Sequence, residues 1–214
     1  MKLYDVSMSI HEAMAVYKNR EANKPKLTVD RDFTKGAWET RLTMNMHTGT
    51  HVDAPFHFLP DGEKIDTMPL DKVIRPCRLL DFTDVPDAVT DTHLKAHDIK
   101  AGDFIILKTR NSTVSGFDPA FVYLDGSGAK YLINKGVVGV GIDALSVERG
   151  QPDHVTHRTL LKEKVVIIEG LRLADVPAGE YLLLAAPLNI IGAEAAPARV
   201  VLVEGLGPVA NGGE

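Results

Sequence analysis

The amino-acid sequence predicts a mixed α/β protein with more strand than helix, folded as a single domain over residues 1–214. Its 214 residues suit one domain by length. Short apolar or β-branched runs recur along the chain, each bounded by Gly, Pro, Asp or Asn, which is typical of strands. Segments with helical periodicity are fewer. Together these observations favour a strand-rich fold with a few short helices.

Seven segments carry the strand pattern. The run Phe104–Lys108 follows a Gly-Asp turn and is continuously apolar, which suits a strand buried on both faces. The runs VVGVGID and KVVIIEGL have the same character. In chain order, the expected strands are Lys26–Val29, Thr43–Met46, Phe104–Lys108, Val137–Ile142, Val165–Glu169, Tyr181–Ala185 and Arg199–Val203.

Three segments indicate helices. In the clearest, Ala129, Leu132 and Ile133 recur at helical spacing, and Lys135 with Gly136 closes the segment. The expected helices are Asp91–His97, Asp125–Lys135 and Thr156–Leu161. The Gly-rich end of the chain, Asn211–Glu214, is expected to fray.

Composition excludes several classes of function. The net charge of -5 and the lack of a basic stripe disfavour a nucleic-acid-binding protein. No uninterrupted apolar run reaches about 18 residues, so no membrane span is expected. The N-terminus lacks the apolar segment of a secretory signal. The single cysteine, Cys77, excludes an intramolecular disulfide and reads as a small apolar residue on a strand. A cytoplasmic location is therefore expected.

One segment, HTGTHVDAPFH, concentrates three of the eight histidines within residues 47–57. A helix would place Asp53 on the side opposite His47 and His51, and the β-branched residues and Pro55 also disfavour a helix. In an extended chain His47, His51 and Asp53 point the same way. The Cα atoms of His51 and Asp53 would then be roughly 6.6 Å apart, whereas those of His47 and His51 would be about 13 Å apart. Either Gly49 bends the chain or His47 serves a second ion.

These side chains favour a metal site. Isolated histidines are usually surface or core residues, but histidines and a carboxylate on one strand face are costly to bury without a cation. Glu169, at the end of an apolar strand, either emerges into solvent or has a partner. His157 could head a short helix packed through Leu160 and Leu161, although taken alone it reads as a surface histidine. The remaining histidines are expected to be solvated, namely His11, His93, His97 and His154.

The segment resembles the signature of the cyclase family, which includes bacterial kynurenine formamidase and isatin hydrolase. The signature reads His-x-Gly-Thr-His-x-Asp-x-Pro-x-His, and this chain matches every specified position. The likeness extends over nearly the whole chain, through LYDVSMSI, GDFIILKTR, VVGVGIDALSVE, HRTLLKEKVVIIEGL and LLLAAPLNIIGAEAAPARVVLVE.

The resemblance implies a compact swivelling β/β/α fold, a homodimer or higher homo-oligomer, and a metal-dependent hydrolase. Kynurenine formamidases carry a zinc pair and isatin hydrolase carries manganese, so one or two ions of Zn or Mn are expected. The implied acid/base is His57. The implied metal ligands are His47, His51, Asp53, His157 and Glu169.

The implied reaction is cleavage of a C–N amide bond in a small aryl formamide, as when N-formylkynurenine yields kynurenine and formate. Two alternatives stay open, namely opening of a cyclic amide, as in isatin hydrolase, and a non-catalytic metal-binding protein. The segment Val16–Asn19 reads VYKN where kynurenine formamidases tend to have an aromatic residue followed by Pro-Gly-Asp, so the substrate pocket could differ. The candidate substrate contacts are Tyr17, Trp38, Phe56 and Phe58.

Overall fold

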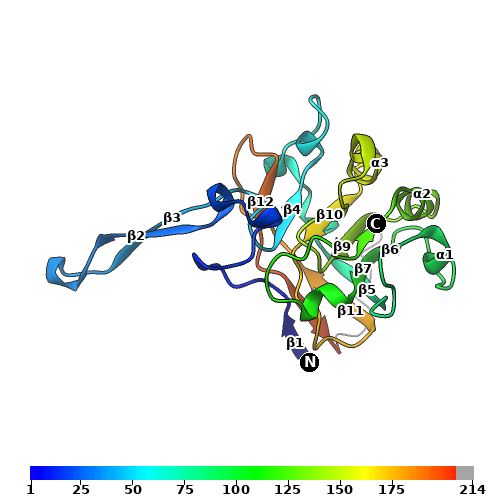
Figure 1. Ribbon diagram of the computed structural model, residues 1–214, viewed down its shortest axis with the longest axis horizontal. Helices are drawn as coiled ribbons and strands as arrows, with labels where there is room; N and C mark the ends of the chain where they lie inside the picture. The colour runs from blue at the N-terminus through cyan, green and yellow to red at the C-terminus, as the bar shows by residue number, and fades with distance from the viewer. Residues whose placement is uncertain (206–214) are drawn as a thin grey trace, which may run out of the picture.

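One nine-stranded sheet organises residues 1–205, which are the residues that the computed structural model describes (Figure 1). Its strands are β1 (Lys2–Asp5), β4 (His51–Asp53), β5 (Ile74–Asp81), β7 (Phe104–Lys108), β9 (Gly139–Ile142), β10 (Val166–Glu169), β11 (Gly179–Leu184), β12 (Ala195–Pro197) and β13 (Val201–Glu204). They lie in the order β1-β13-β11-β5-β7-β9-β10-β4-β12. The run from β5 to β10 is parallel, and every other pairing in the sheet is antiparallel.

The smaller elements surround this sheet. Two further pairs of strands are β2 (Lys26–Arg31) with β3 (Glu39–Thr43), and β6 (Ala88–Val89) with β8 (Tyr123–Leu124). The α-helices are α1 (Asp91–Leu94), α2 (Gly126–Asn134) and α3 (Val155–Lys162), and none of the helices in residues 1–205 has the length and apolar character to cross a membrane. Short 3-10 turns span Tyr17–Asn19, Glu21–Asn23, Phe33–Lys35, Pro55–His57, Ile65–Thr67, Leu70–Lys72, Arg110–Thr113 and Pro152–His154.

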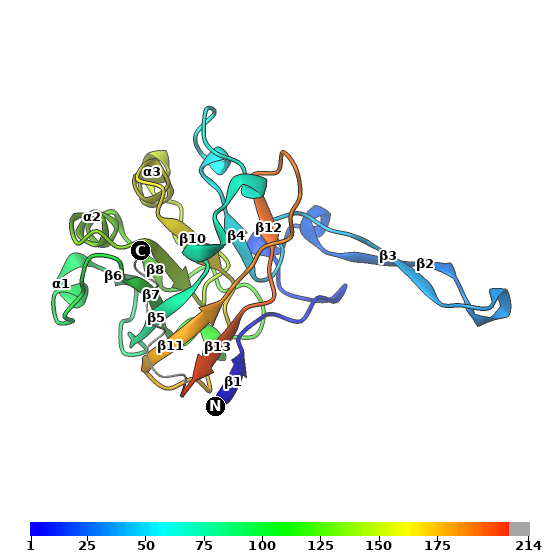
Figure 2. The same ribbon diagram turned by 180° about the vertical axis from the view of Figure 1, so that it is seen from behind.

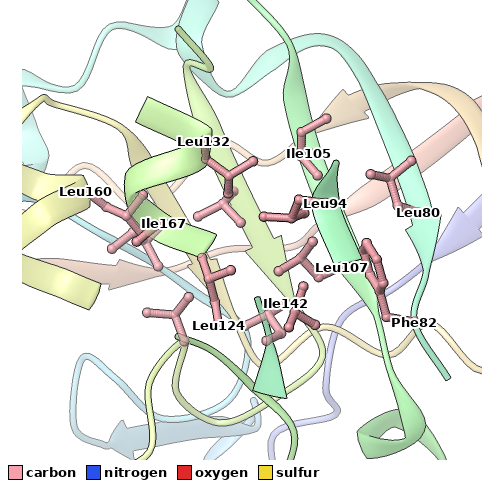
Figure 3. Close-up of a cluster of buried hydrophobic side chains, with 14 of the residues drawn as sticks. Leu80, Phe82, Leu94, Ile105, Leu107, Leu124, Leu132, Ile142, Leu160 and Ile167 are labelled. Atoms are coloured by element: carbon pink, nitrogen blue, oxygen red, sulfur yellow. The ribbon is translucent and has the colours of Figure 1, made fainter. Parts of the chain in front are cut away.

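The three α-helices cover one face of the parallel strands, and a hydrophobic core fills the space between them (Figure 3). Ile105 and Leu107 of β7 belong to this core, whereas Phe104 and Ile106 belong to a second core on the opposite face. This division follows from the two-residue repeat of a strand. A fully buried aliphatic side chain contributes roughly 1.5–3 kcal/mol, so apolar runs such as β7 stabilise both faces of the sheet.

Several predicted elements are confirmed. The strand Phe104–Lys108 has the expected bounds, β9, β10 and β11 begin or end one or two residues away from theirs, and all three helices are present. The strand Thr43–Met46 was wrong, because β3 ends at Thr43 and the chain then turns. Asn45 stabilises this turn, since its side chain accepts a hydrogen bond from the His47 backbone N–H and its carbonyl accepts one from Thr48. The tail Asn211–Glu214 lies outside the described residues.

Cys77 lies on β5 and is buried, as expected for a small apolar residue. Burial raises the pKa of its thiol to about 12, because the thiolate would lose its hydration. The thiol is therefore protonated at neutral pH and has no catalytic character.

The strands β2 and β3 form a long hairpin arm that projects away from the sheet (Figure 2). Leu27 of β2 pairs with Leu42 of β3 in register, and Val29 lies two residues along on the same face. All three side chains are about half exposed. At the distal turn, Phe33 packs on Trp38, with ring centroids 5.6 Å apart. The arm thus presents an apolar face that residues 1–205 leave uncovered.

Candidate metal centre

Strand β4 places two of the expected ligands in the sheet, between β10 and β12. His51 pairs with Glu169 of β10 in register, so these side chains lie next to each other on one face. Asp53, two residues along β4, points to the same face. Val52 alternates to the other face and joins the second core. The extended conformation predicted for this segment is therefore confirmed for His51–Asp53.

His47 reaches the same centre because the chain bends at Gly49, where φ is +75°. Of the two arrangements that the sequence left open, the bend at Gly49 is therefore present, and His47 Nδ1 lies 3.1 Å from Asp53 Oδ1. The threonine between His51 and the glycine points away from the centre. Its hydroxyl, Thr50 Oγ1, donates to the carbonyl of Gly170 at 2.6 Å and accepts from the backbone N–H of Met8.

Helix α3 brings His157 to the centre from the other side. Leu160 and Leu161 are fully buried and fix the helix on the core, as predicted. His157 is only 3% exposed, so its interpretation as a surface histidine when taken alone is wrong. His157 Nε2 lies 3.1 Å from Glu169 Oε1 and 3.7 Å from Asp53 Oδ2.

The potential ligand atoms converge in two sets that share Asp53. One set is His47, Asp53 and His57, and the other is His51, Asp53 and Glu169; within each, all the atoms lie within 4.8 Å of one another. The His57 ring lies against that of His47, with centroids 4.0 Å apart. The structure therefore gathers all five predicted ligands and His57 around one carboxylate.

The chemistry of these side chains fits a divalent cation. Five of their buried atoms have no hydrogen-bond partner among the described residues. His51 Nε2 and both oxygens of Asp53 lie toward the centre, whereas His47 Nε2 lies toward Glu194 and His157 Nδ1 toward Glu148. His51 Nδ1 lies 2.9 Å from the carbonyl of Gly49, so the proton belongs on Nδ1 and the Nε2 lone pair faces the centre. Buried polar atoms without partners are costly, and a cation in the centre would satisfy His51 Nε2 and the oxygens of Asp53 together. A mixed imidazole and carboxylate set suits zinc or manganese.

The pKa values of Asp53 and His51 also indicate that positive charge stabilises the centre. Burial alone would raise the pKa of the Asp53 carboxyl, but the adjacent imidazoles of His47 and His51 hold it well below its usual range. Burial would likewise lower the pKa of His51, yet Asp53 and Glu169 raise it to about 10. In the metal-free protein a proton on His51 thus offsets part of the buried negative charge.

His57 behaves differently. Burial lowers its pKa to about 4, with the charge of Asp53 opposing the shift. Its imidazole is therefore neutral at pH 7, the form that accepts a proton. His57 lies on the 3-10 turn Pro55–His57, two residues past the buried Pro55, and it is partly exposed at the edge of the centre.

The four candidate substrate contacts are placed unequally. Phe58 packs against His57 and His157, with ring centroids 4.2 and 4.5 Å away. Tyr17 packs edge-on against Phe117 and Phe121, and its pKa is raised by burial, with the charges of Glu169 and Glu148 adding to the shift. Phe56 instead packs under Lys64, with the ammonium 4.9 Å from the ring centroid. Trp38, at the distal end of the arm, is not brought to the centre of its own chain.

The sequence analysis missed two carboxylates beside the centre. Glu194, just before β12, places Oε1 3.3 Å from His47 Nε2. Glu148, which is 2% exposed, lies between His154 and His157. Neither stands at a spacing from the signature that any periodicity would mark, so only their proximity in the fold reveals them.

Three of the four histidines expected to be solvated have specific partners. His154 contacts the carboxylate of Glu148. His93 accepts the backbone N–H of Thr90 at the start of α1, and His97 packs edge-on against Phe82. His11 is exposed, as expected.

Comparison with known proteins gives consistent matches. The family model described as "Putative cyclase" matches residues 4–149. A kynurenine formamidase of Salinibacter ruber is 36% identical over 94% of this chain and 97% of its own length. A solved structure described as a potential metal-dependent hydrolase with cyclase activity is 46% identical over 94% of this chain and 96% of that chain, with a TM-score of 0.88. Isatin hydrolase A of Labrenzia aggregata shares the fold at 20% identity and a TM-score of 0.84, covering 94% of this chain and 93% of that chain.

The centre depends on a close approach between Gly49 and Gly170, which can be tested by substitution. Gly170 has φ of +72°, and a Cβ there would lie 2.5 Å from the carbonyl oxygen of Gly49. We expect Gly170→Ala to lower the free energy of unfolding by about 1–2 kcal/mol because of the left-handed backbone. Displacing the segment that carries His47 should lower it by about 1–3 kcal/mol more. Urea unfolding measures the loss. Gly150→Ala is the matched control, because Gly150 has φ of +61° with open space around it. Equal losses for the two variants would show that the glycine contact is unimportant.

Proposed function

The chain belongs to the cyclase family, and we propose that it is a metal-dependent hydrolase that cleaves the C–N amide bond of a small aryl formamide. The observation that carries the proposal is the convergence of the potential ligand atoms of three histidines and two carboxylates on one buried centre. The kynurenine formamidase of Salinibacter ruber, related over nearly its full length, supports the substrate class. Opening of a cyclic amide is the alternative, and the likeness to isatin hydrolase supports it only through the fold.

We assign the metal-holding role to His47, His51, Asp53, His157 and Glu169. A divalent ion held there, zinc or manganese, would supply Lewis acidity and would activate water for attack on a carbonyl carbon. A structural zinc site is closed by four protein ligands, whereas this set has five members and the imidazole of His57 beside it, which favours a catalytic role over a purely structural one.

The other residues supply positioning and proton transfer. His57, neutral at pH 7, accepts the proton of the attacking water and delivers it to the leaving nitrogen, which is general acid–base catalysis. Phe58, packed on His57 and His157, provides an apolar wall on which an aryl ring can stack. Tyr17, in a segment where this chain departs from the family pattern, is the other candidate substrate contact.

The proposed reaction predicts that metal-free protein is inactive and that Zn²⁺ or Mn²⁺ restores hydrolysis of N-formylkynurenine. Absorbance of the released aniline product follows the reaction, and metal analysis counts the ions in parallel. Faster turnover of isatin would favour the cyclic-amide alternative. Tight metal binding with neither substrate consumed would contradict the substrate proposal and favour a non-catalytic site or a hydrolase of another substrate.

The role of His57 predicts that His57→Ala lowers kcat by at least about 100-fold, the usual contribution of an acid–base group, while bound metal is retained. Steady-state kinetics and metal analysis of the same sample measure both effects. His97→Ala serves as control, because His97 packs on Phe82 outside the centre. Loss of metal from His57→Ala would instead make His57 a ligand alongside His47 and Asp53.

We also propose a homodimer or higher homo-oligomer in which the arm packs on a second copy. A two-stranded hairpin is marginally stable alone in water, so the apolar face of β2 and β3 needs cover. Val29→Ser combined with Leu42→Ser should weaken association at least tenfold in sedimentation experiments, whereas Thr28→Ala, on the opposite face, should not. A monomeric wild type at tens of micromolar would refute the proposal. Trp38 could contact substrate only through such a second copy.

A further inference from the structure

A buried carboxylate outside the proposed ligand set holds the first turn of helix α3. Glu148 is 2% exposed. Its Oε2 accepts hydrogen bonds from the backbone N–H groups of Thr156 at 3.1 Å and His157 at 3.2 Å. The same oxygen lies 3.4 Å from His157 Nδ1, and Oε1 contacts His154 Nδ1 at 2.5 Å. One carboxylate therefore contacts both the backbone and the imidazole of His157.

The two ring nitrogens of His157 face different carboxylates. Nε2 faces Glu169 and Asp53 in the centre, while Nδ1 faces Glu148 on the opposite side of the ring. Nδ1 is buried and has no hydrogen bond within the described residues. A neutral imidazole that binds a cation through Nε2 carries its proton on Nδ1, and that proton needs an acceptor. Glu148 Oε2 is placed to accept it after a small rotation of the ring.

The turn before α3 supports this arrangement. Asp153 and His154 both have left-handed backbone conformations, with φ of 56° and 51°, which are costly for residues other than glycine. This turn brings His154 against Oε1 of Glu148, and the His154 ring lies 4.8 Å from that of Phe58. Both oxygens of Glu148 are thus engaged, which fixes the carboxylate beside His157.

We propose that Glu148 is a positioning residue of the metal centre. It accepts the Nδ1 proton of His157, which directs the Nε2 lone pair toward Asp53 and Glu169. The inference rests on the proposed metal-dependent function and deepens it, because it gives the centre a second layer of residues that sets the orientation and proton location of one ligand. The competing explanation is that Glu148 only caps the helix through its two backbone hydrogen bonds.

The substitution Glu148→Gln separates these explanations. The amide oxygen can still accept the two backbone N–H groups, but the negative charge that favours an Nδ1 proton is lost. We expect the affinity for Zn²⁺ or Co²⁺ to fall by about tenfold to hundredfold, the effect typical of losing such a partner. We also expect a shifted visible spectrum of the Co²⁺ protein. Thermal unfolding of the metal-free variant should remain close to wild type.

Glu163→Gln is the matched control, because it makes the same chemical change at an exposed residue at the end of α3. This variant should leave both the metal affinity and the Co²⁺ spectrum unchanged. If Glu148→Gln binds metal with wild-type affinity and an unchanged Co²⁺ spectrum, the positioning role is refuted. A lower unfolding temperature with unchanged affinity would assign Glu148 to helix capping alone and would also refute it. If the wild type binds no divalent metal, the proposed function itself fails, and this outcome is distinct because it does not involve the variant.

Discussion

The centre depends on two carboxylates buried side by side, Asp53 on β4 and Glu169 on β10. Like charges in a water-poor environment repel one another and lose their hydration, so each alone would favour its protonated form. The imidazoles of His47 and His51 reverse this tendency and hold the pKa of the Asp53 carboxyl well below its usual value. The histidines, the bend at Gly49 and the packing of α3 all serve to surround this pair with groups that can share a positive charge.

The two carboxylates come together because β4 pairs antiparallel with β10. The parallel strands β5, β7, β9 and β10 would be extended by further parallel strands in a regular α/β sheet, but β4 runs against β10 instead. This pairing sets His51 opposite Glu169 in register, and the two-residue repeat adds Asp53 to the same face. The hydrophobic cores on both faces hold the register, because a slip of one residue would bury Val52 in the centre and expel its polar neighbours.

Prediction from the sequence succeeded where chemistry is concentrated locally. The extended backbone of His51 and Asp53 was predicted from a few adjacent residues. The continuous apolar run of β7 likewise predicted a buried strand. Prediction was weaker where the decisive contact is distant. His157 alone looked like a surface histidine, and only the resemblance placed it with the ligands. Glu148 carried no local signal, because its neighbours in space come from another element.

The sequence by itself determined the residue types of the centre, the strand-rich class of the fold and the position of the glycine that permits a bend. These depend on intrinsic backbone preferences and on side-chain chemistry, which act over a few residues. Only the tertiary structure decided that Gly49 does bend the chain, that Phe58 lies on the imidazoles while Trp38 does not, and that Glu148 faces His157. Each of these depends on packing between segments far apart in the chain, where burial and sterics select one arrangement that local preferences leave open.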